Sequence, residues 1–363
     1  MKKVLVFGIT DNPGGIESVI MNYYRHFDKK SISLDFLCNT EIVAYEEEIK
    51  SLGGNIYKIC ARSKNYRQYK KNMIDFYKKN ANKYDSIWVN VCSLANIDYL
   101  KYAKKYGIKK RIIHCHNSQN MDSFARGILH RINRIMIKKY ATDFWSCSTE
   151  ASQWFYNQKI INSKKYLLVN NAIDIKKFEY NPRIRDMIRK KLKVEDKVVF
   201  GNVGRLHFQK NQEFALQIFA KYTKNNPNSV FLLIGEGEDK DKLKELVKEL
   251  KIRDKVKFLG IRKDINKLLQ GMDVFLFPSK FEGLSLSLIE AQASGLLIFT
   301  SNTVSKESKM SNYIYFLDLN ANIDTWVNKI TKKIDNEKRK NRKHNISSSF
   351  DINVESKKIQ DLL

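Results

Sequence analysis

Short apolar runs alternate with amphipathic stretches along most of the chain, and this alternation is the first indication of its fold. A short apolar run bounded by turn residues predicts a buried strand, whereas apolar residues at helical spacing predict an amphipathic helix. In the first half the predicted strands cover residues 3–9, 33–38, 55–60, 86–91, 110–115, 143–147 and 166–170. The predicted helices between them cover 15–27, 41–51, 66–80, 94–106, 123–140 and 149–157.

After a charged interval at 176–197, which has no apolar strand run, the same pattern begins again. Strands are predicted over 198–204, 229–234, 256–260, 273–277 and 296–300, and helices over 211–225, 239–250, 264–271 and 287–294. Strands that alternate with helices are typical of a mostly parallel sheet with helices on both faces. The pattern therefore predicts an α/β protein made of two doubly wound, Rossmann-like domains.

The domains are expected at 1–175 and 176–345, and a tail at 346–363 is interpreted as a helix that packs back toward the first domain. In doubly wound sheets, ligands bind outside the carboxyl ends of the strands. With two such domains facing each other, the cleft between them is the expected site.

Composition constrains the size of the core and the kind of partner. The 363 residues are 43% hydrophobic, enough for two packed cores, and the formal net charge is +27. This charge favours attraction to a polyanion such as a membrane surface, although a lysine-rich composition with a solvated basic surface explains it equally well. Nucleic acid is disfavoured as a partner because no zinc pattern or RNA-binding signature accompanies the charge.

The five cysteines stand alone, without a C-x-x-C pair, which favours buried, reduced thiols over disulfides or a metal site. The apolar run at the start is too short for a signal peptide, and no stretch is long enough to span a bilayer. A cytoplasmic location is therefore expected.

Chemically suggestive residues follow several predicted strands. Gly14 and Gly15 come after the first strand and open a helix, where backbone N–H groups can approach a phosphate, although glycine pairs also make ordinary turns. His116 follows the fifth strand with His114 two residues before it. A metal is disfavoured there because no third ligand is evident, and a buried core histidine is the alternative, mainly for His114.

Arg205 and Lys210 stand on the two sides of the loop after the first strand of the second half. A guanidinium fork and a lysine charge on one site suit a diphosphate that gains charge as its bond to a sugar breaks. Glu282 and Glu290 flank a turn that leads into a later helix. Glu290 suits ligand hydroxyls, but Ser287-x-x-Glu290 also matches a helix capping box, and Glu282 is otherwise a surface carboxylate.

Together these segments resemble family 4 glycosyltransferases of the GT-B fold, of the bacterial capsular, exopolysaccharide or lipopolysaccharide type. The resemblance covers nearly the whole chain, and its most specific part is the E-x7-E motif from Glu282 to Glu290. The residues that carry it are Gly14-Gly15-Ile16-Glu17, His116-Asn117, Asn171 with Asp174, Gly204-Arg205, Lys210-Asn211, Phe281-Glu282-Gly283 and Glu290 through Gly295. Two departures are Ala172, where glycine is common in the family, and Ser285, where proline is frequent.

The resemblance implies a retaining transfer from a nucleotide-diphosphate sugar, with a UDP-sugar favoured, to a saccharide or lipid-linked saccharide, without a metal ion or other cofactor. It further implies that Gly14 and Gly15 approach the donor diphosphate and that Arg205 and Lys210 neutralise it. Glu290 would hold the ribose hydroxyls, Glu282 the sugar ring, and the N–H groups at Leu286 and Ser287 a phosphate. His116 would line the sugar site, and the base would lie near Arg262. A non-enzymatic basic protein that binds a membrane or polyanion on the same scaffold is the alternative.

The stretch 124–139 places Ile128, Leu129, Ile132, Ile135 and Met136 at helical spacing among arginines and lysines. One interpretation is packing into the core of the first domain. The other is peripheral docking on the inner face of an anionic membrane, where a lipid-linked acceptor would be found.

Overall fold

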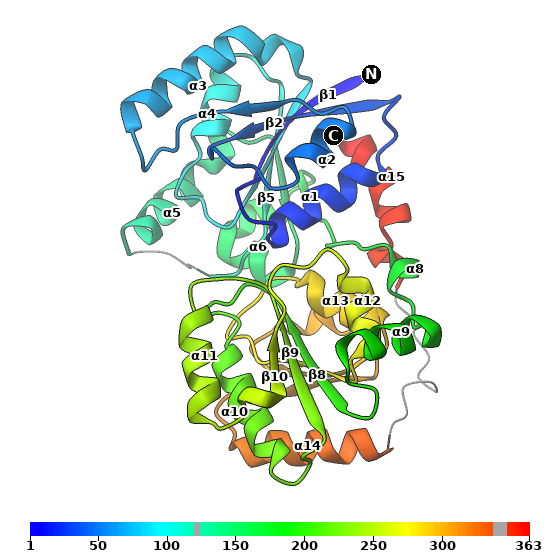
Figure 1. The fold of residues 1–363 in the computed structure, drawn as a ribbon. Coiled ribbons are helices and arrows are strands. Elements are labelled where there is room, and N and C mark those ends of the chain that lie inside the picture. The colour runs from blue at the N-terminus through cyan, green and yellow to red at the C-terminus, as the bar shows by residue number, and fades with distance from the viewer. Residues whose placement is uncertain (120–123, 337–346) are drawn as a thin grey trace. The chain divides into compact units, whose positions relative to one another are not determined.

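The computed structural model describes residues 1–119, 124–336 and 347–363, which form two compact units (Figure 1). The first unit comprises Met1–Ala172 with Ser349–Leu363, and the second comprises Ile173–Ser348. The sequence placed the two boundaries after residues 175 and 345. Residue 123, the predicted start of a helix, and residues 337–346 around the second boundary lie outside the described residues.

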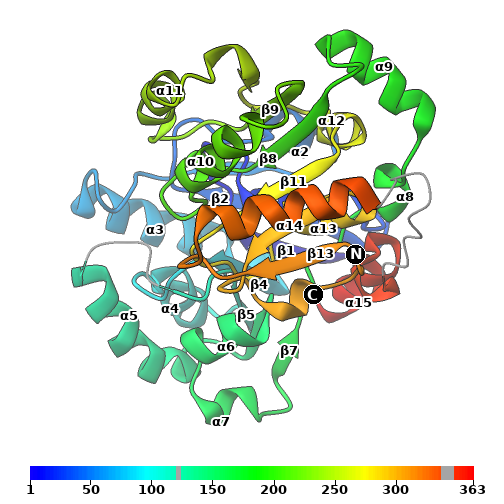
Figure 2. The same cartoon turned by 90° about the horizontal axis from the view of Figure 1, so that it is seen from below.

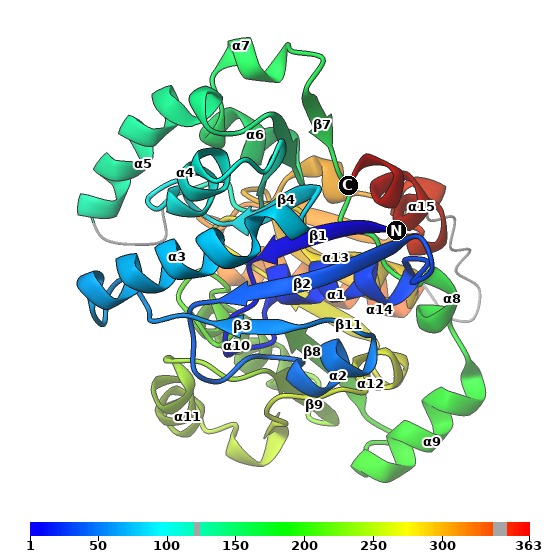
Figure 3. The ribbon, with the colours of Figure 1, turned by 90° about the horizontal axis from the view of Figure 1, so that it is seen from above.

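The first unit is built on a seven-stranded parallel sheet in the order β3-β2-β1-β4-β5-β6-β7. In Figure 3, β1, β2 and β3 lie side by side at one end of this sheet. The strands are β1 (Lys2–Phe7), β2 (Ile32–Cys38), β3 (Ile56–Lys58), β4 (Ser86–Val91), β5 (Lys110–Cys115), β6 (Asp143–Ser146) and β7 (Tyr166–Leu168). Strands covered on both faces are apolar at successive positions, which explains why they read as continuous runs.

The helices of the first unit follow the strands as predicted, with shorter bounds in several cases. They are α1 (Gly15–His26), α2 (Glu46–Ser51), α3 (Tyr66–Asn80), α4 (Asp98–Lys105), α5 (Phe124–Met136), α6 (Thr149–Phe155) and α7 (Gln158–Ile161). Short 3-10 turns lie at Ala81–Lys83 and Ile137–Lys139. The tail forms α15 (Ile352–Leu362), which packs against α1 and so returns the end of the chain to the first unit.

The second unit contains a six-stranded parallel sheet in the order β10-β9-β8-β11-β12-β13. Its strands are β8 (Val198–Val203), β9 (Ser229–Ile234), β10 (Val256–Phe258), β11 (Val274–Phe277), β12 (Leu297–Ser301) and β13 (Ile314–Leu317). Its helices are α8 (Ile175–Phe178), α9 (Pro182–Leu192), α10 (Gln212–Thr223), α11 (Lys240–Glu249), α12 (Ile265–Gly271), α13 (Leu286–Ala293) and α14 (Ile323–Asn336). Further 3-10 turns lie at Arg253–Lys255, Lys306–Ser308 and Ser348–Phe350.

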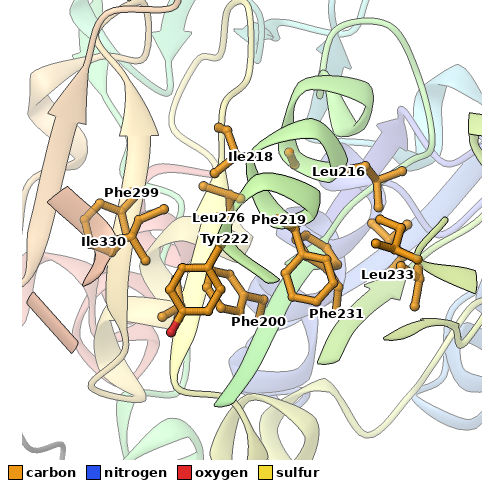
Figure 4. Close-up of a cluster of buried hydrophobic side chains, with 14 of the residues drawn as sticks. Phe200, Leu216, Ile218, Phe219, Tyr222, Phe231, Leu233, Leu276, Phe299 and Ile330 are labelled. Carbon is orange, nitrogen blue, oxygen red and sulfur yellow. The ribbon is translucent and has the colours of Figure 1, made fainter. Parts of the chain in front are cut away.

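A core of large side chains joins this sheet to its helices (Figure 4). Phe200 of β8 packs against Phe219 and Tyr222 of α10 and Phe231 of β9. Figure 2 shows α14 beside α10, and Trp326 of α14 is fully buried. Burial of each such side chain stabilises the fold by about 1.5–3 kcal/mol, so the sheet that carries the strand-end loops is firmly held.

Four elements of the second unit were missed by the sequence patterns: β13, α14, α8 and α9. The last two occupy the charged interval, or directly precede it, between residues 175 and 192. Helix α9 does not have a purely apolar inward face, because its buried positions include Arg189. That guanidinium donates to the carbonyl of Gly271 and to Asp273, so an ionic network takes the place of apolar contacts. None of the described helices has both the length and the apolar character that a bilayer-spanning segment needs.

Candidate active site

The loops at the carboxyl ends of β8, β9 and β10 are packed on one another through glycine. Gly204, Gly235 and Gly260 all have positive φ, and a Cβ at Gly235 would lie 2.0 Å from the carbonyl oxygen of Gly204. The N–H of Gly235 donates to the carbonyl of Gly260 at 2.9 Å. Side chains at these positions would push the loops apart, so glycine keeps the sheet edge compact where the candidate residues lie.

Lys210 and Glu282 form the central ion pair of this edge. Lys210 Nζ lies 2.7 Å from Glu282 Oε1, and the two side chains are 15% and 8% exposed. The lysine stem packs on Gly204, while Glu282 makes an isolated bridge with Val304. The sequence predicted both residues as site residues from separate segments, and the structure brings them into direct contact. A charge pair with so little solvent is strongly coupled, because water screens it only weakly.

Arg205 is held by a different carboxylate, which sequence reasoning missed. Glu238, in the loop before α11, accepts from Arg205 Nε at 3.0 Å and lies 3.2 Å from His207 Nε2. The Arg205 side chain is 61% exposed. Arg205 and Lys210 therefore flank one loop, each with its own carboxylate, and their joint action on one diphosphate stays a prediction.

Glu290 is the fifth residue of α13, and its surroundings exclude the capping box. The helix begins at Leu286 with Ser285 as its N-cap, so Ser287 lies inside the helix. Within the described chain, the Glu290 carboxylate has no hydrogen bond or ion pair. Burial raises its pKa from 4.5 to about 8, against a smaller opposing effect of Lys177. Glu290 is only partly exposed, and a carboxylate that lacks protein donors is suited to bind hydroxyl groups of a ligand.

The start of α13 is free of a side-chain cap, as the predicted phosphate contact at Leu286 and Ser287 requires. Ser285 accepts no cap bond from the helix, and its hydroxyl lies 3.1 Å from that of Ser287. Ser285 has φ −77°, which proline also adopts, so the departure from the family pattern leaves the loop direction unchanged. Uncapped N–H groups at a helix start favour an anion.

Arg262, predicted to lie near the base of the nucleotide, is already paired with a carboxylate of its own loop. Its Nε and NH2 groups donate to the two oxygens of Asp264 at 2.8 and 2.7 Å, just before α12. This bidentate pair raises the pKa of Arg262 and lowers that of Asp264, each through the hydrogen bonds they share. The paired guanidinium offers its remaining edge and its plane to a ligand.

In the first unit, Gly14 and Gly15 open α1 as predicted. Gly14 is the N-cap, and a Cβ there would lie 2.8 Å from an oxygen of Glu17, whereas a Cβ at Gly15 would meet no atom within 4 Å. Glu17 is 6% exposed and accepts from the backbone N–H and hydroxyl of Thr10. Burial raises the pKa of Glu17. The open space at Gly15 is what the approach of a ligand needs, and Glu17 braces the loop.

His114 lies near the end of β5 and His116 directly follows the strand, and their ring centroids lie 4.1 Å apart. His114 is fully buried between Trp88 and Trp145, so it is the core histidine of the two. His116 is partly buried, and its Nε2 lies 2.9 Å from Asn90 Oδ1. Among the described residues, no three His, Cys, Asp or Glu side chains gather as metal ligands would.

The Asn171-Ala172-Ile173-Asp174 segment keeps its shape without the family's glycine. Ala172 is buried and is not among the residues with positive φ, so its Cβ causes no strain. Asp174 caps α8 by accepting from the N–H of Lys177 at 3.2 Å.

Comparison with known proteins shows which class of protein the chain is similar to. The family model described as glycosyl transferases group 1 matches residues 184–348. A putative glycosyltransferase of Bacillus subtilis, EpsF, is 28% identical over 327 residues, which cover 88% of this chain and 85% of that protein. The UDP-Gal:alpha-D-GlcNAc-diphosphoundecaprenol alpha-1,3-galactosyltransferase of Escherichia coli is 29% identical over 245 residues, 65% of this chain and 63% of that one. The capsular polysaccharide glycosyltransferase CapH of Staphylococcus aureus is 25% identical, with 70% of both chains covered.

Among solved structures, HepE of Anabaena in complex with UDP and glucose superposes with a TM-score of 0.82 at 17% identity, over 100% of this chain and 99% of that one. The matches define the chain as a glycosyltransferase. Residues 184–348 match the glycosyl transferases group 1 model, and the fold of the chain is the GT-B fold, as its motifs predicted. The non-enzymatic alternative has no support from these relatives.

Proposed function

We propose that the chain is a retaining glycosyltransferase that moves a sugar from a UDP-sugar to a saccharide or lipid-linked saccharide during assembly of a bacterial surface polysaccharide. One observation carries the proposal. The loops after the strands of the second sheet carry the Lys210–Glu282 ion pair, and α13, which follows β11, has an uncapped start and the partly buried Glu290 carboxylate. This set offers a cation, free N–H groups and a hydroxyl acceptor, which match diphosphate and ribose.

The names of similar proteins support the choice of donor and acceptor. The Escherichia coli relative is named for UDP-Gal and for an acceptor carried on diphosphoundecaprenol, and the Staphylococcus aureus relative for capsular polysaccharide. HepE was solved with UDP-glucose. These names favour a UDP-sugar donor and a lipid-linked saccharide acceptor for this chain.

In the proposed reaction, the protein stabilises charge rather than forming a covalent intermediate. Lys210 and Arg205 neutralise the departing diphosphate, and the N–H groups at Leu286 and Ser287 bind a phosphate. Glu282 is already bound to Lys210, so it is suited to position the lysine and contact the sugar ring rather than to act as a nucleophile. Retention then follows from attack on the same face, with the leaving phosphate accepting the proton of the acceptor hydroxyl. No metal ion takes part in this scheme.

Thermal unfolding with nucleotides tests the proposed donor site. A saturating excess of UDP is expected to raise the Tm by several degrees, because a ligand at about 100 times its Kd adds about 2.7 kcal/mol of stability. Arg205→Ala is expected to abolish this rise without destabilising the free protein, since the side chain is largely exposed. Arg253→Ala, an exposed arginine of the same unit, is the control and should respond to UDP like the parent. Absence of stabilisation by UDP, GDP and ADP would exclude the proposed site.

We further propose that α5 attaches the enzyme to the surface of an anionic membrane. In this helix the apolar side chains face solvent, whereas those of a core helix face inward. The exposed residues are Ile128, Leu129, Ile132, Ile135 and Met136, and Ile135 is 80% exposed. The core-packing interpretation of these residues is therefore wrong. The inward positions are instead polar and are held by hydrogen bonds to the segment before α4.

His130 and Asn133 make those bonds. The N–H of Leu94 donates to His130 Nδ1 at 3.0 Å, and Asn133 donates to the carbonyl of Leu94 at 2.6 Å. The His130 ring also stacks on Trp154 at 4.0 Å. Because polar contacts anchor the helix, its apolar face is left toward solvent at the edge of the first unit (Figures 1 and 3). Arginines and lysines border that face, which fits an anionic lipid surface.

Flotation with vesicles tests this attachment. Ile132→Ser with Ile135→Ser is expected to reduce binding to vesicles that contain an anionic phospholipid by about tenfold or more, because two apolar side chains no longer leave water. Ile42→Ser is the control, since Ile42 is 73% exposed in the same unit but is remote from α5 in sequence. Parent protein that stays wholly in the aqueous fraction would contradict the attachment and leave the donor-site proposal untouched.

A further inference from the structure

Asn90, the last buried residue of β4, holds a fixed orientation beside His116. Its Nδ2 donates to the carbonyls of Phe7 and Trp88, each at 3.4 Å, which leaves Oδ1 as an acceptor. Oδ1 faces His116 Nε2 at 2.9 Å. A carbonyl oxygen can only accept, so the proton of the neutral imidazole must sit on Nε2.

The surroundings of the His116 ring favour its uncharged form. Its neighbour His114 is fully buried, and neither of its ring nitrogens has a hydrogen-bond partner, so the contact is apolar and neutral. Burial lowers the pKa of His116 to about 3. Within the described residues, His116 Nδ1 has no hydrogen-bond partner, and it is not among the buried polar atoms without one. Its lone pair is therefore left without a donor from the described residues.

Gly8 makes this arrangement possible. Its φ is +136°, and a Cβ there would lie 2.7 Å from the Cβ of Asn90. Only glycine allows the chain after β1 to lie so close to Asn90, and the carbonyl of Phe7 at the end of β1 accepts from the Asn90 amide. The orientation of the amide is thus set by the backbone of two neighbouring strands.

We propose that Asn90 is a positioning residue that fixes His116 as the Nε2–H tautomer, so that Nδ1 accepts a hydrogen bond from a hydroxyl of the bound sugar. This inference deepens the proposed function and rests on it only for the identity of the ligand. A neutral acceptor orients a hydroxyl without placing a positive charge near a sugar carbon that itself becomes positive in the transition state. A lysine or a protonated histidine at this place would oppose that charge.

Nitrogen NMR of the full chain labelled in histidine tests the tautomer directly. The chain has six histidines, and the signals that disappear in His116→Gln identify those of His116. The expected spectrum at neutral pH shows a protonated Nε2 and an unprotonated Nδ1, unchanged down to about pH 4, because the pKa is low. A protonated Nδ1, or an imidazolium at neutral pH, would overturn the proposal whether or not any nucleotide binds.

Two variants connect the tautomer to turnover. Asn90→Asp keeps an acceptor but adds a charge, so His116 is expected to titrate closer to neutral pH and the transfer rate to fall as the pH is lowered through that value. Asn90→Ala is expected to reduce kcat by about tenfold and to leave UDP affinity within about twofold. Asn80→Asp, at another buried asparagine of the same unit, controls for general effects of a buried charge. Equal losses in the Asn90 and Asn80 variants, with an unchanged pH profile, would show a merely structural role.

Discussion

Glu290→Gln is expected to make the free protein more stable at pH 8 and, at the same time, to abolish its stabilisation by UDP. The carboxylate has an ordinary pKa of 4.5 in the unfolded chain and about 8 in the fold, because burial disfavours its charge. Between these values the native state binds a proton that the unfolded state has lost. Stability therefore decreases as the pH rises from about 4.5 to 8.

The substitution removes this cost, which is on the order of a few kcal/mol at pH 8, because each pKa unit corresponds to about 1.4 kcal/mol. A rise in Tm of about 2 °C or more is the expected sign. Glutamine replaces one of the two charged acceptor oxygens by an amide that donates, so its hydrogen bonds with two ribose hydroxyls are weaker and less well placed than those of a carboxylate. Gain of stability and loss of binding in one variant would identify a group placed for a ligand rather than for the fold.

The pH dependence of UDP affinity follows from the same group. Hydroxyl donors favour the ionised carboxylate, so its pKa is lower in the complex than in the free protein. Binding then releases a proton below about pH 8, and affinity is expected to rise with pH up to that value, by at most tenfold per unit. Calorimetry at several pH values checks this, with Glu249→Gln, an exposed glutamate of α11, as the control. A parent affinity that is flat from about pH 6 to 8 would contradict the assigned role.

Removal of Lys210 is expected to give the largest loss of both stability and transfer. Lys210→Met leaves the Glu282 carboxylate, which is 8% exposed, without the cation that lies 2.7 Å from it. Breaking one partner of a buried pair costs about 3–5 kcal/mol. Transfer is expected to fall by at least about 100-fold, because the departing diphosphate loses a fixed positive charge.

A double-mutant cycle separates the two effects. Adding Glu282→Gln to Lys210→Met removes the stranded charge, so much of the stability should return, while transfer stays low. Denaturant unfolding and transfer assays on the four proteins measure both quantities. Lys242→Met, which breaks an exposed ion pair with Glu213 in the same unit, should change each by little. Recovery of transfer together with stability would mean that the pair serves the fold alone.

The sequence predicted most of this framework because parallel strands carry a strong local signal. All strands predicted from apolar runs are present, and Gly14, Gly15 and His116 lie at strand ends of the first sheet as expected. The missed β13 is a run of only four apolar residues, Ile314–Leu317, of which only Ile314 is buried, and α9 has a buried arginine beside its buried Ile188. A run this short and a helix with a charge at an inward position both give weak local signals.

Partners of the site residues were harder to predict than the residues themselves. Glu238 and Asn90 each fix a candidate side chain, yet they lie in another loop or strand, and only the fold brings them to Arg205 and His116. Asp264 is only two residues from Arg262, but the spacing alone does not show that the two side chains pair. The sequence also could not show which face of α5 points to solvent, because an apolar stripe has the same spacing whether it faces a core or solvent. The polar contacts of His130 with Leu94 decide it.

Titration calorimetry of the full chain with UDP, GDP and ADP tests the central claim most directly. We expect saturable binding of one UDP per chain, weakened at least about tenfold in Glu290→Gln and in Lys210→Met with Glu282→Gln, and unchanged in Glu249→Gln. Absence of binding by all three nucleotides up to millimolar concentration, or binding that these variants leave unchanged, would contradict it.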